Sequence, residues 1–291
     1  MEKILVTGAS GHLGNEIANL LLAIVPAANL SVLVRDPAKV EDLRKKGVRV
    51  LQGDYSNYNS LVQAFSGIDK LMFVSSNDLA NRLSQHTNVI KAAAEAKVKH
   101  MVFTSFQRKN ETSTSPIYFL TGEYVASEKM LAASGVTYTI LKNGLYTDFL
   151  PMMLGEKVLE TGTIYIPAGT GKAAYTLRSD LAAGAVAILT SKGHENKTYE
   201  FCADKAYTFE EVAAVLSHVA GKPVRYISPT QDEYKRTLLE AGVPGPFVNL
   251  IAGSADAIKQ GEFEKTNNTL SQLIGRECTD LETFLAGVYK K

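Results

Sequence analysis

Short apolar runs alternate with longer helical runs along the first half of this chain. The apolar runs, rich in Val, Ile, Leu, Phe and Met, predict strands at 3–7, 30–35, 48–52, 69–75, 100–104 and 137–141. The stretches between them predict helices near 12–24, 37–46, 58–66, 79–97 and 118–134. Near-continuous apolar strands separated by helices are typical of a parallel sheet covered on both faces. The pattern therefore predicts an α/β fold with a doubly wound parallel sheet of the Rossmann type, whose ligand lies beyond the carboxyl ends of the strands.

The alternation stops after Asn143, and the second half has a different character. Residues 144–175 are expected to be irregular, and a further strand is expected at 198–202. Thr208 and Glu211 have the spacing of a capping box that opens a helix. Most of the chain beyond that helix is also expected to be helical.

These patterns predict two parts of unequal size. We expect a nucleotide-binding domain at 1–150, with a return contribution from about 174–205. A smaller, mostly helical substrate domain at 151–291 is expected to close over the ligand. The glycine-containing segment 168–172 is expected to form a mobile loop that covers the site. A chain of 291 residues can bury a substantial core in such an arrangement.

A glycine-rich turn directly follows the first predicted strand. Gly8, Gly11 and Gly14 are spaced three apart between that strand and a helix. Gly8 permits the sharp turn, Gly11 lets the backbone approach a pyrophosphate, and Gly14 lets the helix pack close to the strand. The helix N-terminus then directs free N–H groups at the anion. We therefore expect a dinucleotide site whose first contacts come from Thr7, Gly8, Ser10, Gly11, His12 and Leu13.

Arg35 follows the second predicted strand, at the position that lies beside the adenosine ribose in this architecture. An acidic residue there suits NAD, whereas an arginine suits the 2′-phosphate of NADP because its planar group donates paired hydrogen bonds. Lys39 could add positive charge. The alternative is that Arg35 is merely solvated and Asp36 binds the ribose. Asp36 precedes Pro37, however, and has the position of a helix cap, so the sequence favours NADPH.

Small polar residues follow the next three predicted strands. Asp54 comes after the third strand, where it can accept a hydrogen bond from adenine or cap the following helix; the sequence leaves both open. Five residues at the ends of the fourth and fifth strands are expected to line the trough for the ribose and nicotinamide, namely Ser75, Ser76, Asn77, Thr104 and Ser105. Ordinary turn chemistry is the alternative explanation for these five.

Composition and charge exclude several classes of protein. The net charge is +1 with mixed signs and no basic run, so nucleic-acid binding is not indicated. The two cysteines lie far apart in sequence, which argues for a reducing compartment and against a disulfide framework. The five histidines show no metal-ligand spacing. The apolar runs are too short to span a bilayer and no signal peptide is evident, so we expect a cytoplasmic protein without a metal or a membrane anchor.

Together these motifs make the chain similar to the NmrA-like group of atypical short-chain dehydrogenases. The residues that carry the resemblance are Gly8, Gly11 and Gly14, Val34-Arg35, Gly53-Asp54, 141–149 (LKNGLYTDF), 193–199 (GHENKTY) and 273–275 (LIG). The likeness therefore covers nearly the whole chain. It is strongest toward a branch that reduces quinones or triphenylmethane dyes. The resemblance implies an NADPH-binding domain, a small C-terminal substrate domain and direct hydride transfer to a planar acceptor.

The chain lacks the proton relay that typical short-chain dehydrogenases carry as Tyr-x-x-x-Lys. Tyr124 is followed four residues later by Glu128, and Lys129 lies one position further on, turned away by the helical period. Reduction of a ketone creates a basic alkoxide and benefits from a positioned acid. Reduction of a quinone gives a delocalised anion that water can protonate. The missing dyad therefore favours quinone or dye reduction over alcohol dehydrogenation.

Within this scheme, residues around the sixth predicted strand supply the acceptor site. Asn143 is expected to contact the nicotinamide side of the cofactor. Phe106, Tyr146 and Phe149, together with Met152, are expected to form an aromatic wall on which a flat acceptor rests. Ordinary core packing is the alternative for each of these aromatic residues. The protein would orient the two reactants while the cofactor carries the redox chemistry.

Two functions of different class fit the sequence. The first is an NADPH-dependent reductase of quinone-like acceptors, acting as a monomer or homodimer. The second is a non-catalytic redox sensor that binds NAD(P) and signals through a protein partner, which is attractive because no catalytic acid or base can be named. The segment 143–146 favours the enzyme.

Overall fold

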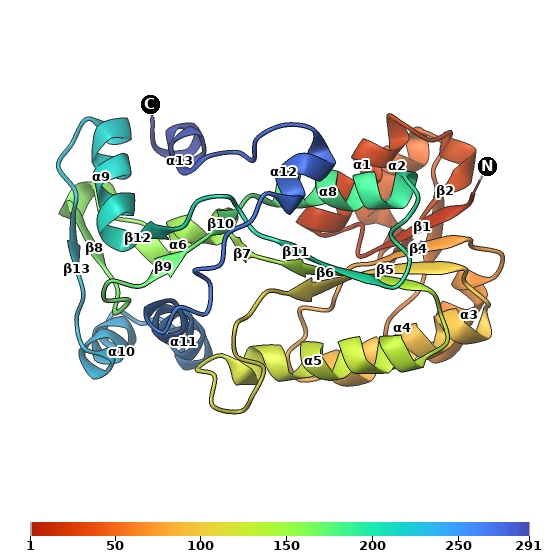
Figure 1. The fold of residues 1–291 in the computed structure, drawn as a ribbon, viewed down its shortest axis with the longest axis horizontal. Helices are drawn as coiled ribbons and strands as arrows, with labels where there is room; N and C mark the ends of the chain where they lie inside the picture. Colours follow the sequence, from red (N-terminus) through yellow and green to blue (C-terminus); the bar gives the residue numbers. More distant parts are fainter. Residues whose placement is uncertain (1, 291) are drawn as a thin grey trace.

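The structure, a computed structural model, describes residues 2–290. Its centre is a seven-stranded parallel sheet in the order β3-β2-β1-β4-β5-β6-β11 (Figure 1). The strands are β1 (Ile4–Thr7), β2 (Leu30–Val34), β3 (Arg49–Gln52), β4 (Lys70–Phe73), β5 (His100–Phe106), β6 (Tyr138–Asn143) and β11 (Lys197–Phe201). The strand order reverses between β1 and β4, and such a switch point is where doubly wound sheets bind their ligands. The predicted fold class is confirmed.

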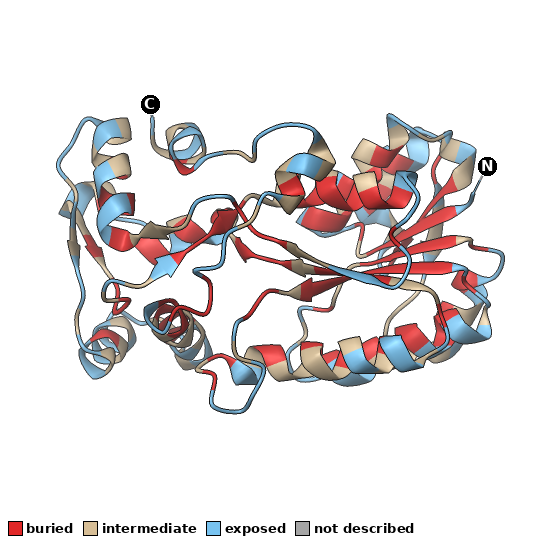
Figure 2. Ribbon diagram, in the orientation of Figure 1, coloured by how far each residue is buried: buried red, intermediate tan, exposed pale blue. Residues whose placement is uncertain are grey.

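Helices cover both faces of the sheet (Figure 1). One layer contains α1 (His12–Leu22), α2 (Glu41–Lys45), α8 (Arg178–Thr190) and α12 (Thr269–Ile274). The other contains α3 (Tyr58–Phe65), α4 (Arg82–Glu95) and α5 (Tyr118–Ala133). A separate apolar cluster fills each layer, and the central strands β1, β2 and β4 between them are buried along their length (Figure 2). Burial on both faces explains why β1, β2 and β4 are apolar at almost every position rather than at alternate ones.

A third apolar cluster holds the remaining elements together, toward the left of Figure 1. These elements are β7 (Leu145–Tyr146), α6 (Leu150–Leu154), α7 (Val158–Thr161), β8 (Thr163–Tyr165), β9 (Lys172–Ala173), β10 (Tyr175–Thr176), β12 (Tyr207–Thr208), α9 (Phe209–Ala220), β13 (Arg225–Ile227), α10 (Gln231–Glu240), α11 (Gly245–Lys259) and α13 (Leu281–Tyr289). The predicted capping box at the start of α9 is confirmed, because Thr208 and Glu211 bond each other's backbone N–H groups.

The segment 144–175 is not irregular, contrary to the prediction. Its short strands pair with distant partners: β7 with β10, β8 with β13, and β9 with β12. Strands of two or three residues give no periodic signal of their own. They form because these partners are brought beside them by the fold.

The segment 168–172, which the sequence predicts to be a mobile loop over the site, makes several contacts with the C-terminal part. Gly169 donates its N–H to Ser228 Oγ at 3.0 Å, and the Tyr226 hydroxyl lies 3.1 Å from the Gly169 carbonyl oxygen. A Cβ at Gly171 would lie 2.2 Å from the Ile258 carbonyl oxygen, so the segment is pressed against the end of α11. These contacts hold the segment 168–172 against the elements of the third apolar cluster.

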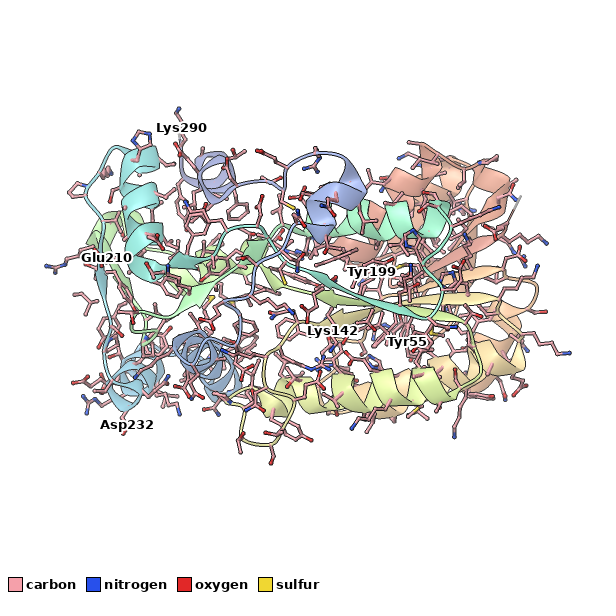
Figure 3. The ribbon with its side chains drawn as sticks, in the orientation of Figure 1. Tyr55, Lys142, Tyr199, Glu210, Asp232 and Lys290 are labelled. Carbon is pink, nitrogen blue, oxygen red and sulfur yellow. The ribbon has the colours of Figure 1, made fainter. Side chains whose placement is uncertain are left out.

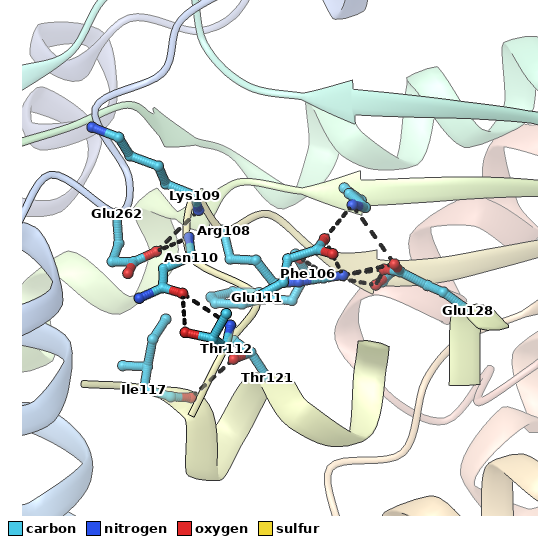
Figure 4. Close-up of polar contacts among 12 residues, drawn as sticks. Phe106, Arg108, Lys109, Asn110, Glu111, Thr112, Ile117, Thr121, Glu128 and Glu262 are labelled. Atoms are coloured by element: carbon cyan, nitrogen blue, oxygen red, sulfur yellow. Dashed lines mark hydrogen bonds and ion pairs between the residues drawn. The ribbon is translucent and has the colours of Figure 1, made fainter. Parts of the chain in front are cut away.

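A buried carboxylate joins the two parts of the molecule. Glu262, which follows α11 and is 3% exposed, accepts hydrogen bonds from the backbone N–H groups of Lys109 and Asn110 at 3.0 and 2.9 Å. Its other oxygen accepts from Ser115 Oγ at 3.2 Å. These bonds hold the connection between β5 and α5 against the C-terminal part (Figure 4). Within residues 2–290, no helix combines the length and apolar character needed to cross a bilayer.

Candidate active site

The turn between β1 and α1 is shaped for a phosphate by its backbone alone. Gly8 has a φ of +64°, and the Gly11 N–H donates to the Gly8 carbonyl oxygen at 2.9 Å. A Cβ at Gly14 would lie only 2.4 Å from that same oxygen, so only glycine allows α1 to approach the strand so closely. No side chain of the described residues caps α1. Its first N–H groups are therefore free to bind an anion.

The Tyr55 side chain joins the ends of β1 and β4 next to this turn, a role that sequence reasoning missed. Its hydroxyl lies 2.5 Å from Thr7 Oγ1 and 2.8 Å from the Val74 carbonyl oxygen. Thr7 Oγ1 in turn accepts the Val74 N–H at 3.0 Å, so the predicted site residue Thr7 has its side chain engaged within the sheet. Burial raises the pKa of Tyr55. Figure 3 shows Tyr55 on the face that α3, α4 and α5 cover, where it joins the ends of β1 and β4.

The two charged residues that follow β2, Arg35 and Asp36, have different roles. Asp36 Oδ1 accepts the Ala38 N–H at 3.0 Å and caps the turn that follows, as predicted. Arg35 is exposed, and its side chain makes no hydrogen bond or ion pair with any residue of the 2–290 range. The guanidinium is therefore available for a ligand, whereas one oxygen of Asp36 is already engaged.

The alternative role left open for Asp54, capping the next helix, is excluded. The cap of α3 is Asn57, whose side chain accepts the Ser60 N–H at 3.1 Å. Asp54 Oδ1 instead accepts the Ser56 N–H at 2.8 Å. The Asp54 carboxylate thus shapes the loop after β3 and has its second oxygen free to accept another hydrogen bond.

The polar residues at the carboxyl ends of β4 and β5 come together, but most of their side chains bond to protein. Thr104 Oγ1 accepts the Ser75 N–H at 2.8 Å, and Ser75 Oγ lies 3.2 Å from the Tyr124 hydroxyl. Ser76 Oγ donates to Gln85, and Ser105 Oγ donates to Glu128. Of the five predicted trough residues, Asn77 is exposed and Ser75 is partly buried, whereas Ser76, Thr104 and Ser105 are buried.

A buried histidine fixes the backbone after β4. His86 Nε2 accepts the Ser76 N–H at 3.0 Å, and His86 Nδ1 lies 2.8 Å from Ser127 Oγ. Its ring also contacts the edges of Phe73 and Phe103. Burial, with a smaller contribution from the Arg82 guanidinium, lowers the pKa of His86 to about 3. The imidazole therefore stays neutral and keeps Nε2 as an acceptor at neutral pH.

We predict that His86 makes the folded protein less stable in acid. The lowered pKa means that the unfolded chain takes up a proton below about pH 6.5 while the folded chain does not, so stability falls as the pH falls. Between about pH 7.5 and 4.5, His86 should account for a decrease of about 2–3 kcal/mol in the free energy of unfolding. Denaturant titrations of the wild type over this pH range should show this decrease in the free energy of unfolding, and those of His86→Gln should not. His218→Gln, which removes an exposed imidazole, should keep the wild-type slope.

Glu128, which stands where the Tyr-x-x-x-Lys motif has its lysine, is paired with a buried arginine (Figure 4). Arg108 is fully buried and donates to both oxygens of Glu128 at 2.8 and 2.6 Å. It also donates to Glu111, which Lys142 contacts from β6 at 2.9 Å. Lys129 is exposed on α5. Burial opposes the charge of Arg108, but the two glutamates outweigh it and raise the pKa of this guanidinium. A carboxylate with fixed cationic partners thus replaces the lysine of the usual dyad.

An aromatic pair lies next to Asn143. Tyr146 and Phe149 stack with their ring planes 9° apart and their centroids separated by 5.7 Å. The Asn143 amide nitrogen lies 3.5 Å from the Tyr146 hydroxyl, whereas the buried Asn143 Oδ1 has no hydrogen-bond partner within residues 2–290. Burial raises the pKa of Tyr146 to about 12. The tyrosine is therefore neutral at physiological pH.

The predicted wall residues differ in their exposure and in their contacts. Phe149 and Met152 are each 44% exposed, which leaves apolar surface for a ligand. Phe106 is opposite Asn143 in the β5–β6 register and stacks on Tyr124 with centroids 6.2 Å apart. The guanidinium of Arg178 lies 5.6 Å from the Phe149 ring centroid. Sequence reasoning missed Arg178, because α8 reaches the aromatic pair only through the fold.

The phosphate turn, the switch point and the polar strand ends define a dinucleotide-binding protein of the Rossmann class. Residues 1–286 match the NmrA-like family, and the chain belongs to that family. This confirms the resemblance drawn from the sequence motifs.

Relatives of known activity match almost the full length. Quinone oxidoreductase 2 of Escherichia coli is 37% identical over 98% of both chains. The NAD(P)H azoreductase of Xenophilus azovorans is 34% identical over 83% of this chain and 82% of its own. Among solved structures, Citrobacter sp. triphenylmethane reductase complexed with NADP(H) superimposes with a TM-score of 0.90, at 38% identity and 99% coverage of both chains.

Proposed function

We propose that this protein is an NADPH-dependent oxidoreductase that transfers a hydride directly to a quinone or a similar planar acceptor. The similarity over more than four fifths of the chain to a quinone oxidoreductase, an azoreductase and a dye reductase supports this class of reaction. The observation that carries it in this chain is the unpaired Asn143 Oδ1 beside the stacked Tyr146 and Phe149. That juxtaposition offers a polar contact for a nicotinamide next to a flat apolar surface.

The described residues fit the coenzyme at both of its ends. The free N–H groups at the start of α1 suit the pyrophosphate, and the unengaged Arg35 suits the 2′-phosphate. The buried Asn143 Oδ1 suits the amide N–H of the nicotinamide, since such an orphaned acceptor is otherwise costly. NADPH, when bound, supplies the hydride. We propose as its contacts the residues Thr7, Gly8, Ser10, Gly11, His12, Leu13, Arg35, Asp54, Ser75, Ser76, Asn77, Thr104, Ser105 and Asn143.

The chain's own residues act by position rather than by acid–base chemistry. Phe106, Tyr146 and Phe149 are proposed to hold the flat acceptor and exclude water from its face. The Tyr124 hydroxyl lies 3.2 Å from Ser75 Oγ and makes no hydrogen bond with a lysine of residues 2–290. A quinone suits such a site because its reduced anion needs no fixed proton donor. The same site serves poorly for a ketone, whose reduction does.

Turnover tests this proposal directly. Purified protein should oxidise NADPH in the presence of benzoquinones, naphthoquinones or triphenylmethane dyes, as followed by absorbance. Isothermal titration calorimetry should first establish that NADPH binds. Tight NADPH binding without turnover of any of these acceptors would instead favour the redox-sensor function.

The aromatic wall makes its own prediction. Phe149→Ala removes a half-exposed ring from the proposed acceptor surface, so KM for the acceptor should rise about fivefold to tenfold, as loss of stacking implies. The Kd for NADPH should not change. Phe247→Ala is a matched control, because Phe247 is a comparably exposed phenylalanine on α11. Steady-state kinetics with equal KM values for both variants would contradict the assignment.

A further inference from the structure

A cationic side chain lies against the proposed acceptor surface. Arg178 is the first residue of α8, which begins two residues after β10, and β10 pairs with β7 just beyond the carboxyl end of β6. The guanidinium carbon of Arg178 lies 5.9 Å from the ring centroid of Tyr146 and 5.6 Å from that of Phe149. The two centroids are themselves 5.7 Å apart. The guanidinium therefore stands beside the junction of the two rings.

This position leaves both the rings and the cation accessible. A guanidinium stacked flat on a ring lies about 4 Å from the ring centroid, so Arg178 covers neither ring. Phe149 is 44% exposed and the Arg178 side chain is 22% exposed. Nε of Arg178 is buried, whereas its two terminal nitrogens are not and make no hydrogen bond within residues 2–290. The terminal nitrogens are therefore free to contact an acceptor on this surface.

Asp148 orients the guanidinium without cancelling its charge at the rings. Asp148 Oδ2 accepts the backbone N–H of Arg178 at 3.0 Å, and Asp148 Oδ1 lies 3.1 Å from Arg178 Nε. Burial raises the pKa of Tyr146 to about 12, and Arg178 lowers this pKa by more than Asp148 raises it. The pair as a whole therefore favours negative charge beside Tyr146, whose hydroxyl lies next to the Asn143 amide.

The two classes of planar acceptor change their charge in different ways on reduction. A neutral quinone gains a hydride with its two electrons and becomes a hydroquinone anion, which then takes a proton from water, while NADPH is oxidised to NADP⁺. A triphenylmethane dye is a cation, and the hydride forms a C–H bond at its central carbon to give a neutral product. A fixed cation beside the acceptor stabilises the anion formed in the first reaction and repels the reactant of the second.

We propose that Arg178 determines the charge preference of the acceptor site. Its guanidinium favours quinones, above all those that carry a negative group, and disfavours cationic dyes. This inference rests on the proposed reductase function and specifies its class of acceptor. Asp148 is a positioning residue, because it holds the guanidinium at Nε and leaves the terminal nitrogens free.

Equilibrium binding tests this preference without turnover. Calorimetric titrations use the full chain saturated with NADP⁺, so that no hydride is available. The probes are 1,4-naphthoquinone, its anionic 2-sulfonate and the cationic dye malachite green. In Arg178→Met, the Kd of the sulfonate should rise about tenfold and that of malachite green should fall about threefold to tenfold, because the remaining charge is that of Asp148. Arg178→Lys, which keeps the positive charge, should keep the wild-type order of affinities.

Asp148→Asn provides the reciprocal test. It removes the negative charge, while its amide oxygen can still accept the Arg178 N–H. The sulfonate should therefore bind more tightly and malachite green more weakly than in the wild type. Opposite effects of Arg178→Met and Asp148→Asn exclude a merely structural role, since a disturbed site would bind all three probes more weakly in both variants. Arg236→Met, which removes an exposed guanidinium on α10, should change none of these Kd values.

Steady-state kinetics with NADPH give the catalytic readout. In Arg178→Met, kcat for 1,4-naphthoquinone should fall about threefold to tenfold, while kcat/KM for malachite green should rise. Equal changes in Kd for the sulfonate and malachite green, or no change in either, would overturn the role of Arg178, as would no binding of the sulfonate to the wild type. Absence of turnover in the wild type would instead overturn the proposed function, and the Kd values would still decide the charge preference.

Discussion

Arg35→Ala is expected to weaken NADPH binding by roughly tenfold to hundredfold while leaving NADH binding nearly unchanged. Charge-assisted hydrogen bonds to a phosphate contribute about 1.5–3 kcal/mol, which corresponds to that change in Kd. Arg35 is exposed just beyond β2 with its side chain unengaged by residues 2–290, so the substitution removes no contact of the fold. Calorimetric titration with each coenzyme measures both affinities.

Arg49→Ala provides the matched control for this experiment. Arg49 is also exposed, but it begins β3 and therefore lies at the amino edge of the sheet, opposite the proposed coenzyme site. Its loss should change neither affinity. If Arg35→Ala lowers NADPH and NADH affinity equally, or lowers neither, then Arg35 does not bind the 2′-phosphate.

Arg108→Met is expected to lower the free energy of unfolding by about 3 kcal/mol. The guanidinium is fully buried and bonds both oxygens of Glu128, a side chain that is itself only 12% exposed. Removing one partner of a buried pair leaves the other charge uncompensated, which destabilises by about 3–5 kcal/mol. The lower end applies here because Lys142 lies 3.6 Å from Glu128. Urea denaturation followed by circular dichroism measures the change.

An exposed arginine–glutamate pair with the same hydrogen bonds, Arg44 and Glu41, provides a control. Arg44 also donates to both oxygens of a glutamate, Glu41, at 2.7 and 2.8 Å, but its side chain is 65% exposed. Arg44→Met should therefore destabilise the protein much less than Arg108→Met, because water screens an exposed pair. Adding Glu128→Leu to Arg108→Met should recover part of the lost stability, since no buried charge then lacks its partner. Equal effects of Arg108→Met and Arg44→Met would show that burial does not govern the contribution of this pair.

The strands and the coenzyme turn could be predicted because their signals are local. The apolar runs that form β1, β2, β4 and β5 are buried on both faces, so their composition alone indicates them. Gly8 and Gly14 are each required by backbone geometry within a few residues, Gly8 by its positive φ and Gly14 by its close approach to the Gly8 carbonyl oxygen. The same is true of the capping box at Thr208 and of the cap at Asp36. In each case, the interacting groups lie within one turn of chain.

The buried side chains that hold the backbone of the site in place could not be predicted in this way. Tyr55 reaches Thr7 across 48 residues, and His86 reaches Ser127 across 41. Both are ordinary residues in the sequence, with no spacing that indicates a role. The short strands β7 to β10 escaped prediction for the same reason, because each is formed with a partner from a distant segment.

Local patterns in the chain thus decide the fold class, the glycine cradle and the choice of Arg35 over Asp36 as the free group at the end of β2. Folding alone decides that Arg108 bonds Glu128 without exposure to water and that Glu262 joins the two parts. The physical reason is that helix, turn and cap energies depend on neighbours in sequence. Burial and the pairing of polar groups depend on which distant segments the sheet brings together.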